Sequence, residues 1–550
     1  MEKEFLTAAL PYANGPLHLG HLLELTCADA YARHRRAALA RRGGSLLFVC
    51  ADDQHGAAVA LRARREGIAP EALVERLWRE RVEELAAFGI SLDIHHRTHA
   101  PECRELAELA HARLAAAGLL ATREREQLYD PVEKCFLADR FVEGDCPRCA
   151  APGQHGDHCA ACGASYEARE LGRPASRLSG ATPTLKTGRS VLFELSREPV
   201  GAFCRAFALE GPALSPPSKA KLAEWLGAPL RDWDISRQEP NFGFPIPGEP
   251  GLLFHCWFDA PLGYYGAARA ALEKLGRGGE FAELLDPDSS WRVTHFVGKD
   301  IVHFHGLFWP AICRFAGFKL PDEIRSHGFL TSRGRKLAKS EGKAATAADY
   351  LASGLDPELL RFYLFSKFDG GSGDVDISAA DFRAKIDSEL VGKWANLASR
   401  LWPFAAGPLG GVLPGLAEAH PLTGLAAELS PQIEQAFESW DFARARRLAF
   451  SLLEEANRQV ENAAPWRLAR EGGRGAELAR AVHAGLSAFE TATRWLAPAI
   501  PRSSARALAC LNAPAEVDDP AAPIEAGRRI GAFEPLALRL PPGSAEALLG

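Results

Sequence analysis

Apolar and polar positions follow two different periods along the chain, and the change of period separates its regions. Near the N-terminus, Phe5–Leu10 and Ser45–Cys50 are short apolar runs typical of buried strands. Between them, the segment from Leu17 to about Arg36 has the 3.6-residue period of a helix. Strands that alternate with helices are typical of a parallel α/β sheet. We therefore predict such a sheet, with ligands at the carboxyl ends of its strands.

Two later regions follow different patterns. From about residue 120 to about residue 230 the chain has short β-prone pieces around pairs of cysteines, which predicts an inserted domain. The α/β pattern returns at Trp291–Val297 and continues to Gly328. Beyond about Asp381 the period is helical almost throughout, and it predicts helices at Phe382–Leu401, Ala426–Val460 and Ala476–Leu496.

Length and composition narrow the class of protein. At 550 residues the chain exceeds what one core supports, so we expect two to four domains. Hydrophobic residues make up 47% and charged residues 24%, as in an ordinary globular protein. Neither a secretory signal nor an apolar run of membrane-spanning length is present, so we expect a soluble, cytoplasmic protein. A net charge of −6 argues against a uniformly basic surface but leaves room for a local basic track that binds RNA.

The cysteines indicate a metal site. The chain has 12 cysteines, of which eight are scattered singly, a pattern typical of reduced thiols in the core. The other four form two C-x-x-C pairs, Cys146 with Cys149 and Cys159 with Cys162. Each pair presents two thiolates to one ion, and together they predict one tetrahedral Zn²⁺ site. Four cysteines leave no open coordination position, so the zinc is expected to be structural.

Two histidines at the start of the first predicted helix indicate a phosphate site. His18 and His21 lie three residues apart, next to the N–H groups that a helix N-terminus leaves unpaired. Such groups attract anions, and imidazoles donate to oxygens that develop charge. Gly20 keeps the backbone bare where a nucleotide must lie close. The histidine pair alone is weak evidence, but the strand before it and the helix after it favour this function over simple packing.

Other segments allow two interpretations. Lys336 and Lys339, in a loop that follows Gly334, can neutralise a transferring phosphate, although in isolation the loop is better explained as solvated and basic. The segment His95–His99 suggests a metal site, but an exposed loop is the favoured interpretation. The aromatic run Leu252–Tyr265 is expected to belong to the core or to a pocket wall. Trp466 is expected in the core or as a platform for an unstacked base.

Taken together, these segments resemble the methionyl-tRNA synthetases, a family of class I aminoacyl-tRNA synthetases. The resemblance runs in order from about residue 4 to about residue 540 and is specific because it combines many motifs. The motifs are ALPYANG at Ala9–Gly15, HLGH at His18–His21, CADDQHG at Cys50–Gly56, WDISR at Trp233–Arg237, WFDAP at Trp257–Pro261, GKDIVHFH at Gly298–His305, NLASR at Asn396–Arg400 and APW at Ala464–Trp466.

The resemblance implies an α/β fold with a Rossmann-type parallel-sheet catalytic domain, which a zinc-binding connective domain splits, followed by an α-helical anticodon-binding bundle. The expected boundaries are 1–119 for the first catalytic half, 120–230 for the connective domain, 231–328 for the second catalytic half, 329–385 for a linking segment with the lysine loop, 386–535 for the anticodon-binding domain and 536–550 for a C-terminal peptide.

The resemblance also implies an activity: methionine is activated with ATP and Mg²⁺ to methionyl-adenylate, pyrophosphate leaves, and methionine passes to tRNA(Met). Asp53 would bind the substrate ammonium and Arg237 its carboxylate, in a pocket whose other residues are Ala9, Leu10, Tyr12, Trp257, Ala260, Pro261, Tyr264, Ile301 and His305. ATP would contact Asn14, His18, Gly20, His21, Gly298, Asp300, His327, Gly328 and Lys339, with His18, His21, Lys336 and Lys339 as the catalytic residues. Asn396, Arg400 and Trp466 would read the anticodon.

The chain departs from the family's pattern in the lysine loop. The family's usual K-M-S-K-S is here Lys336-Leu337-Ala338-Lys339-Ser340, and Glu341 stands where an arginine is common. A carboxylate beside a polyphosphate is unfavourable by Coulomb repulsion, which leaves the rate of adenylation open. A C-terminal dimerisation domain that some relatives carry is lacking, so a monomer is expected.

Three alternatives remain open. The altered lysine loop is compatible with a catalytically weakened paralogue that binds RNA or regulates. A class I synthetase for another amino acid is a second alternative, but a branched-chain enzyme needs a longer editing insertion than about 110 residues. A duplicate methionyl enzyme that tolerates an inhibitor is the third.

Overall fold

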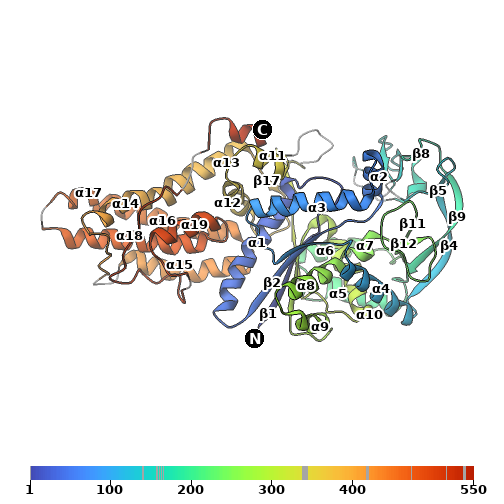
Figure 1. Ribbon diagram of the computed structural model, residues 1–550, viewed down its shortest axis with the longest axis horizontal. Helices are drawn as coiled ribbons and strands as arrows, with labels where there is room; N and C mark the ends of the chain where they lie inside the picture. Colours follow the sequence, from blue (N-terminus) through green and yellow to red (C-terminus); the bar gives the residue numbers. More distant parts are fainter. Residues whose placement is uncertain are drawn as a thin grey trace.

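The computed structural model describes residues 2–138, 141–156, 159, 161–162, 164, 166–336, 345–416, 420–471, 473–515, 517–536 and 540–549, with the side chains of 335 and 336 excepted. The molecule is elongated (Figure 1). A helical part lies at one end, a parallel sheet in the middle and an antiparallel sheet at the other end. Within the described part of the chain, no helix combines the length and apolar composition that crossing a membrane requires.

The central sheet has five parallel strands in the order β14-β13-β1-β2-β3. Their bounds are Glu323–His327, Arg292–Gly298, Lys3–Ala8, Ser45–Asp52 and Ile94–Arg97. The strands predicted near the N-terminus and at residues 291–297 are therefore confirmed, to within two residues at most ends. The chain leaves β1 toward β2 on one side, and β13 returns on its other side. This reversal between β1 and β13 is where open α/β sheets bind ligands.

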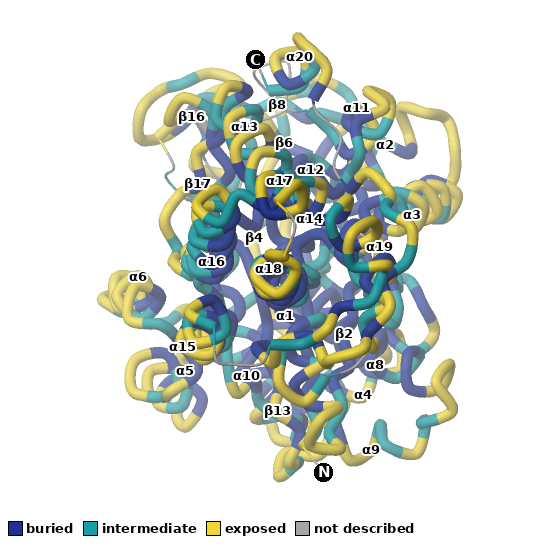
Figure 2. Tube along the Cα trace, turned by 90° about the vertical axis from the view of Figure 1, so that its left-hand side faces the viewer, coloured by how far each residue is buried: buried dark blue, intermediate teal, exposed yellow. Residues whose placement is uncertain are grey.

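Both faces of the sheet are buried, because alternate residues of each strand enter different cores. Leu6 and Phe48 join one hydrophobic cluster with α1 (Leu19–Ala40) and the C-terminal helices. Phe5 and Val49 join a second cluster with α4 (Pro101–Ala116), α8 (Leu262–Lys274) and α10 (Trp309–Ala316). Smaller clusters lie under α2 (Ala57–Glu66) and α3 (Pro70–Ala87). One cluster thus extends from the sheet into the helical part. Figure 2 shows the buried positions in the middle of the molecule and the exposed ones around the edge.

The predicted insertion begins where the pattern changes. An antiparallel sheet in the order β10-β9-β4-β5 is built from Trp233–Asp234, Thr184–Phe193, Leu120–Asp130 and Cys135–Phe136. A second antiparallel sheet, β7-β6-β8, surrounds the cysteine pairs with Gln154–His155, Val142–Asp145 and Gly172–Ser176. Helices α5 (Val200–Leu209) and α6 (Pro216–Leu226) connect β9 to β10.

Short helices and strands connect the inserted region to the parallel sheet, and the sheet to the C-terminal helices. Hairpin β11-β12 (Ser236–Gln238 and Leu252–Phe254) leads into α7 (Cys256–Asp259), and α9 (Phe281–Leu285) precedes β13. After β14, strands β15 (Leu330–Ser332), β16 (Arg335–Lys336) and β17 (Val375–Asp376) form a small sheet. Helices α11 (Ala347–Ala352) and α12 (Pro357–Lys367) lie between β16 and β17 in the chain.

The C-terminal part is helical, as predicted, with one difference. Its elements are α13 (Ala379–Lys385), a π-helical turn at Ile386–Ala395, α14 (Asn396–Ala406), α15 (Pro421–Glu438), α16 (Phe442–Ala463), α17 (Pro465–Leu468), α18 (Gly475–Leu496), α19 (Pro501–Cys510) and α20 (Ser544–Leu549). The periodic stretch Ala426–Val460 is two helices, because Trp440 turns to φ +65° and the side chain of Asp441 caps α16. Trp440 stacks on Tyr31 and Phe296, so the break fills the core against the parallel sheet.

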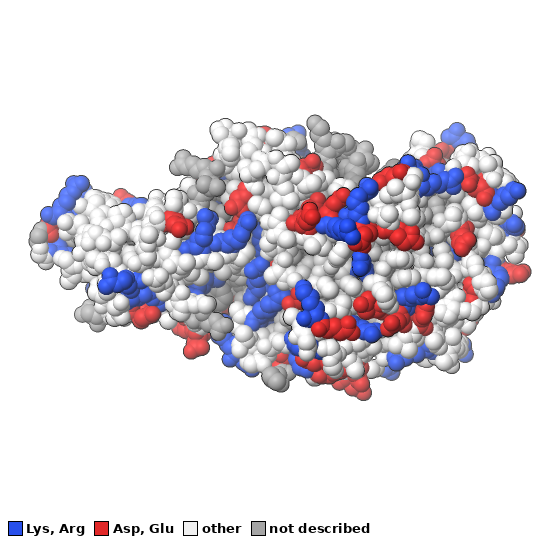
Figure 3. All heavy atoms as spheres, viewed as in Figure 1, with Lys and Arg blue, Asp and Glu red and all other residues white. Residues whose placement is uncertain are grey.

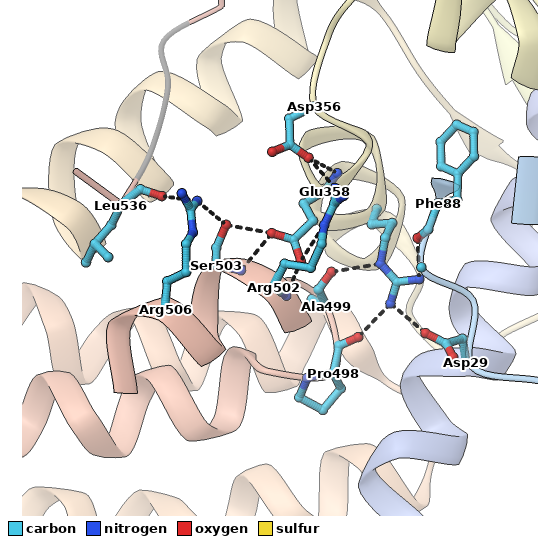
Figure 4. A network of polar contacts seen from close by, with 12 residues as sticks. Asp29, Phe88, Asp356, Glu358, Pro498, Ala499, Arg502, Ser503, Arg506 and Leu536 are labelled. Carbon is cyan, nitrogen blue, oxygen red and sulfur yellow. Dashed lines mark hydrogen bonds and ion pairs between the residues drawn. The ribbon is translucent and has the colours of Figure 1, made fainter. Parts of the chain in front are cut away.

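One guanidinium joins the helical part to α1, the helix that packs on the parallel sheet (Figure 4). Arg361, on α12, is fully buried and donates to Asp29 on α1 at 2.6 Å. It also donates to the carbonyl oxygens of Phe88, Pro498 and Ala499 at 2.9–3.2 Å. One turn earlier, Glu358 accepts from the N–H and hydroxyl of Ser503 and so caps α19. Three separate segments are therefore fastened to α12 by hydrogen bonds.

We predict that Arg361→Met lowers the free energy of unfolding by about 3–5 kcal/mol, because it leaves the buried Asp29 carboxylate and three carbonyls without their donor. Denaturant unfolding of the purified variant measures this loss. Arg33→Met is the matched control, since Arg33 also pairs with Asp29 at 2.8 Å but is 28% exposed. We expect the control to cost about 1 kcal/mol or less. Equal losses of unfolding free energy in the two variants would contradict the proposal that Arg361 is the main link between α12 and α1.

Candidate functional site

The two histidines of the HLGH segment cap helix α1 with each other. The His21 N–H donates to Nδ1 of His18 at 3.3 Å, and the His18 N–H donates to Nδ1 of His21 at 3.2 Å. Their rings stack with centroids 3.6 Å apart. Because each Nδ1 accepts, each neutral ring carries its proton on Nε2. Nε2–H is then a donor that a phosphate oxygen can accept beside the helix N-terminus.

A buried arginine that sequence reasoning missed holds the turn before this helix. Arg81 donates to the carbonyl oxygens of Pro11, Tyr12 and Gly15 at 2.7–3.1 Å. It also pairs with the buried Asp52 at 2.7 Å. The signal was in the sequence: Arg81 continues the apolar spacing of Leu73, Leu77 and Leu85 along α3. A cation on that stripe needs buried acceptors, and the turn supplies them.

Two carboxylate oxygens beside the turn are buried without a hydrogen-bond partner in the part of the chain that the structure describes, as a site for a cation requires. Asp53 pairs through its backbone with Tyr12 and Ala13, which places it at the end of β1. Oδ1 of Asp53 and Oδ1 of Asp259 are both buried and have no hydrogen-bond partner among the described residues. Burial, together with the charge of Asp259, raises the pKa of Asp53 well above its usual value. A bound ammonium supplies the missing partner and favours the ionised carboxylate.

The segment His95–His99 corrects the expectation of an exposed loop. Its first residues form β3 inside the sheet, and His95 is buried with Nε2 2.9 Å from Oδ1 of Asp52. His99 contacts Nε2 of His55 at 2.9 Å, and the other ring nitrogen of His55 pairs with Asp259. Burial lowers the pKa of His99 to about 4. These histidines are therefore buried beside Asp52 and Asp259, two carboxylates that lie far from them in the sequence.

An aromatic and apolar wall faces the other side of this site. The Tyr264 hydroxyl lies 2.9 Å from Nε2 of His305, whose Nδ1–H donates to the carbonyl of Ile301. Since burial lowers the pKa of His305 to about 4, its ring is neutral and Nε2 accepts from Tyr264. Ala260 and Pro261 are buried nearby in the chain, while Trp257 is 45% exposed. Most residues of the aromatic run Leu252–Tyr265 are thus at least partly buried, whereas Trp257 is exposed at the surface.

Close contacts connect this wall to the first half of the sheet. A Cβ on Gly263 would lie 3.5 Å from Cδ1 of Leu10, and one on Gly56 would lie 2.8 Å from the Tyr12 hydroxyl. Ala9 donates its N–H to Phe296, at the end of β13. The residues predicted for methionine binding therefore come from both halves of the sheet and meet at their carboxyl ends.

Arg237 lies at the edge of the same region. Its side chain is 17% exposed, its Nη1 donates to the carbonyl of Ser236 at 2.7 Å, and its Nη2 approaches Nε2 of His255 at 3.4 Å. Burial and the charge of Arg237 lower the pKa of His255 well below its usual value. A neutral His255 can accept from the guanidinium and hold its orientation.

Two glycines on the opposite side of the switch point pack closely against neighbouring atoms. A Cβ on Gly298 would lie 2.5 Å from Oδ1 of Asp300, and one on Gly328 would lie 2.0 Å from the carbonyl oxygen of Gly373. Neither position accepts a side chain without moving its neighbours. Asn14 and Asp300 are exposed. Gly20 follows His18, whose ring would contact a Cβ there at 3.0 Å.

His327 forms a buried hydrogen-bonded pair that sequence reasoning missed in part, because Glu24 was not singled out. Nδ1 of His327 faces the carbonyl of Gly328 at 2.8 Å, and Nε2 faces Oε2 of Glu24 at 2.8 Å. A carbonyl oxygen only accepts hydrogen bonds, so Nδ1 carries a proton and donates to Gly328. Burial alone would lower the pKa of His327, but the hydrogen bond and charge of Glu24 outweigh it and raise the pKa.

The lysine loop can be followed only at its flanks. Lys336 ends β16, while Lys339 and the departures at Ala338 and Glu341 lie outside the described residues. Before the loop, the Gly334 N–H donates to Asp376 at 2.9 Å. After it, Thr346 pairs with His18, and Ala345 accepts from the Leu19 N–H at 3.3 Å. The chain therefore leaves the loop directly against the start of α1.

The four predicted cysteines come together in a geometry that fits a tetrahedral metal ion. Their sulfur atoms all lie within 4.8 Å of one another, with Cys146 to Cys162 at 3.8 Å and Cys149 to Cys159 at 3.6 Å. A tetrahedral Zn–S bond of about 2.3 Å requires sulfur atoms about 3.8 Å apart. Backbone N–H groups of Arg148 and Cys149 donate to Sγ of Cys146, which stabilises thiolate charge. The donor set can hold a metal ion such as zinc.

The predicted RNA-reading residues form a second group at the far end of the helical part. The guanidinium carbon of Arg400 lies over the Trp466 ring at 5.4 Å, and Arg400 also pairs with Glu461 at 2.5 Å. Asn396 lies one turn earlier on α14, and all three residues are half-buried. The face in Figure 3 shows basic and acidic side chains interleaved, consistent with the prediction that the protein is not uniformly basic.

The Glu24–His327 pair predicts a pH dependence of stability. A raised pKa means that the folded state binds its proton more tightly, so the stabilisation is complete below the unfolded value of 6.5 and is lost as pH rises through the folded pKa. Burial also raises the pKa of Glu24, which has the same sign. We expect the melting temperature to fall as pH rises above about 6.5, and to fall more steeply in the wild type than in His327→Gln. Parallel curves would contradict the raised pKa of His327.

Comparisons with known proteins agree with this geometry. The model of the family "tRNA synthetases class I (M)" matches residues 4–402. A methionine–tRNA ligase of Nitrosomonas europaea is 43% identical over 92% of this chain and 72% of its own length. One of Burkholderia cenocepacia is 40% identical over 99% and 75%. A Mycobacterium tuberculosis methionyl-tRNA synthetase in complex with methionyl-adenylate shares the fold, with a TM-score of 0.79 at 22% identity, over 98% of this chain and 99% of that one. The chain therefore belongs to the methionyl group of the class I tRNA synthetases.

Proposed function

We propose that this chain is a methionine–tRNA ligase, which activates L-methionine with ATP and transfers it to tRNA(Met) for translation initiation and elongation. The observation that carries the proposal is the identity of 40–43%, over nearly the whole chain, to proteins of that name. The arrangement at the switch point supports it, because an apolar wall, a cation site and a phosphate-binding helix end meet there. Class I synthetases carry out this chemistry mainly by positioning and charge stabilisation.

Methionine would lie between the aromatic wall and the enclosed carboxylates. Asp53 would bind its ammonium, with Asp259 as a second enclosed carboxylate, and Arg237 would bind its carboxylate. Ala9, Leu10, Tyr12, Trp257, Ala260, Pro261, Tyr264, Ile301 and His305 would surround the side chain. The hydroxyl proton of Tyr264 is directed to His305, so this wall offers few donors and favours a thioether over a carboxylate.

ATP would lie across the switch point from methionine. Nε2–H of His18 and of His21 would donate to the phosphate oxygens at the helix N-terminus, and Gly20 would let the nucleotide approach. Asn14 would lie beside the phosphates, the ribose near Gly298 and Asp300, and the adenine near His327 and Gly328. Lys336 and Lys339 would neutralise the leaving pyrophosphate together with Mg²⁺. The methionine carboxylate then attacks the α-phosphate, the bond to the bridging oxygen breaks, and pyrophosphate leaves.

The remaining assignments concern the second substrate and the metal. Asn396, Arg400 and Trp466 would recognise the anticodon by hydrogen bonds and stacking. The four cysteines would bind one structural Zn²⁺. We expect a monomer that works in the cytoplasm, where its tRNA substrate is found.

The proposal predicts amino-acid-dependent ATP–pyrophosphate exchange with methionine alone, measured on the purified protein with each standard amino acid in turn. Restoring the family's loop in Ala338→Ser with Glu341→Arg should raise the exchange rate, because it removes a carboxylate from the phosphate site. The single variant Glu124→Gln, at an exposed position of β4, is the control. Absence of exchange from folded, metal-loaded protein would favour the RNA-binding paralogue instead.

Metal content provides an independent prediction. The purified chain should contain about one zinc per molecule, and Cys149→Ser should lose most of it, because a thiolate contributes one of four ligands. Elemental analysis measures the content, and the melting temperature should fall with it. Cys135→Ser is the matched control, since Cys135 lies in the same domain outside the cluster. Equal zinc in both variants would refute the assigned ligand set.

A further inference from the structure

Two exposed tryptophans converge on one histidine beside the proposed methionine pocket. Trp225 is 44% exposed and stacks on His303, with ring centroids 4.7 Å apart and planes 9° apart. Trp257 is 45% exposed and meets the same His303 edge to face at 6.0 Å. Burial lowers the pKa of His303, so its ring is neutral and adds flat apolar surface. The three rings together form a stacking surface that is open to solvent.

This surface lies at the mouth of the reaction site. His303 is two residues from both Ile301 and His305, which belong to the aromatic wall. Trp257 is part of that wall, while Trp225 comes from α6 of the inserted domain. Trp225, from α6, and Trp257, from α7, both contact His303. Figure 2 shows α6 at the edge of the molecule, with exposed residues on it. The stack therefore bridges the inserted domain and the catalytic domain at the edge of the pocket.

The transfer reaction brings the unpaired 3′-terminal base of tRNA to the edge of the methionine pocket. The terminal ribose hydroxyl of tRNA must reach the methionyl carbonyl, so the base on that ribose lies within one nucleotide of the pocket. Unstacked bases bind proteins chiefly by stacking on aromatic rings. We propose that Trp225 and His303 form the stacking platform for the 3′-terminal base of tRNA during transfer. This inference rests on the proposed function.

The surroundings of Trp225 fit a nucleic acid better than a protein partner. Helix α6 carries Lys219 and Lys221, and Arg231 follows six residues after Trp225. Glu224 pairs with Lys221 at 2.6 Å, which offsets its charge. A protein partner would need an apolar contact area larger than these three rings provide. A stacked base needs only one aromatic face, with cations nearby for its phosphate.

The test separates activation from transfer. Trp225→Ala, Trp225→Phe and the exposed control Leu275→Ala are compared with the wild type in methionine-dependent ATP–pyrophosphate exchange and in single-turnover transfer from preformed adenylate. Transfer uses two probes: tRNA with its 3′-terminal adenosine, and the same tRNA with an abasic terminal ribose. Trp225→Ala should exchange normally but transfer to complete tRNA about 5-fold to about 100-fold more slowly. Trp225→Phe and Leu275→Ala should retain most of the transfer rate.

The abasic probe makes the result specific to the base. Removing the base should slow the wild type about as much as Trp225→Ala does, and should slow that variant no further. A full base-removal effect in the variant, wild-type transfer by the variant, or a parallel loss of exchange would each overturn the platform. A wild type without methionine-dependent exchange would instead refute the proposed function. In that case, equilibrium binding of the two tRNAs to wild type and Trp225→Ala still decides whether the base stacks there.

Discussion

The fold depends on a buried ion pair between Arg361 and Asp29. A guanidinium without exposure is stable only if nearly all its donors are satisfied, and here a carboxylate and three carbonyl oxygens satisfy them. Asp29 lies on α1, the same helix that begins with His18 and His21 and carries Glu24. The pair therefore fixes the helix that holds the phosphate site relative to the helical domain. A single hydrophobic cluster that runs from Leu6 to the C-terminal helices supports the same joint.

Burial and hydrogen bonding shift the pKa values of these histidines in opposite directions. His305 and His255 are neutral, because burial lowers their pKa values, and they accept hydrogen bonds that orient Tyr264 and Arg237. The pKa of His327 is raised, because the hydrogen bond and charge of Glu24 outweigh the effect of burial. The proposed methionine pocket thus has neutral rings around an apolar wall. On the proposed ATP side, His327 binds its proton more tightly.

The two proposed RNA contact sites lie far apart in the molecule. Arg400 and Trp466 lie near one end of the elongated chain, whereas Trp225 and His303 lie beside the parallel sheet (Figure 1). An RNA that reaches both must span the distance between the helical part and the parallel sheet. The surface in Figure 3 has interleaved charge, so recognition is expected to depend on local groups of cations and rings.

The sequence by itself determined the parallel sheet, the position of the insertion, the helical C-terminal part and the four-cysteine site, because each depends on spacing within one segment. It also identified most residues that meet at the switch point, through motifs that resemble a known family. Tertiary structure decided what depends on contacts between distant segments. Arg81 supports a turn 66 to 70 positions away, and the His95 side chain contacts Asp52 on the neighbouring strand. Trp440 divides a periodic stretch, and its ring packs on Phe296 of the parallel sheet. The raised pKa of His327 likewise depends on Glu24, 303 positions earlier, and no local pattern encodes such a pairing.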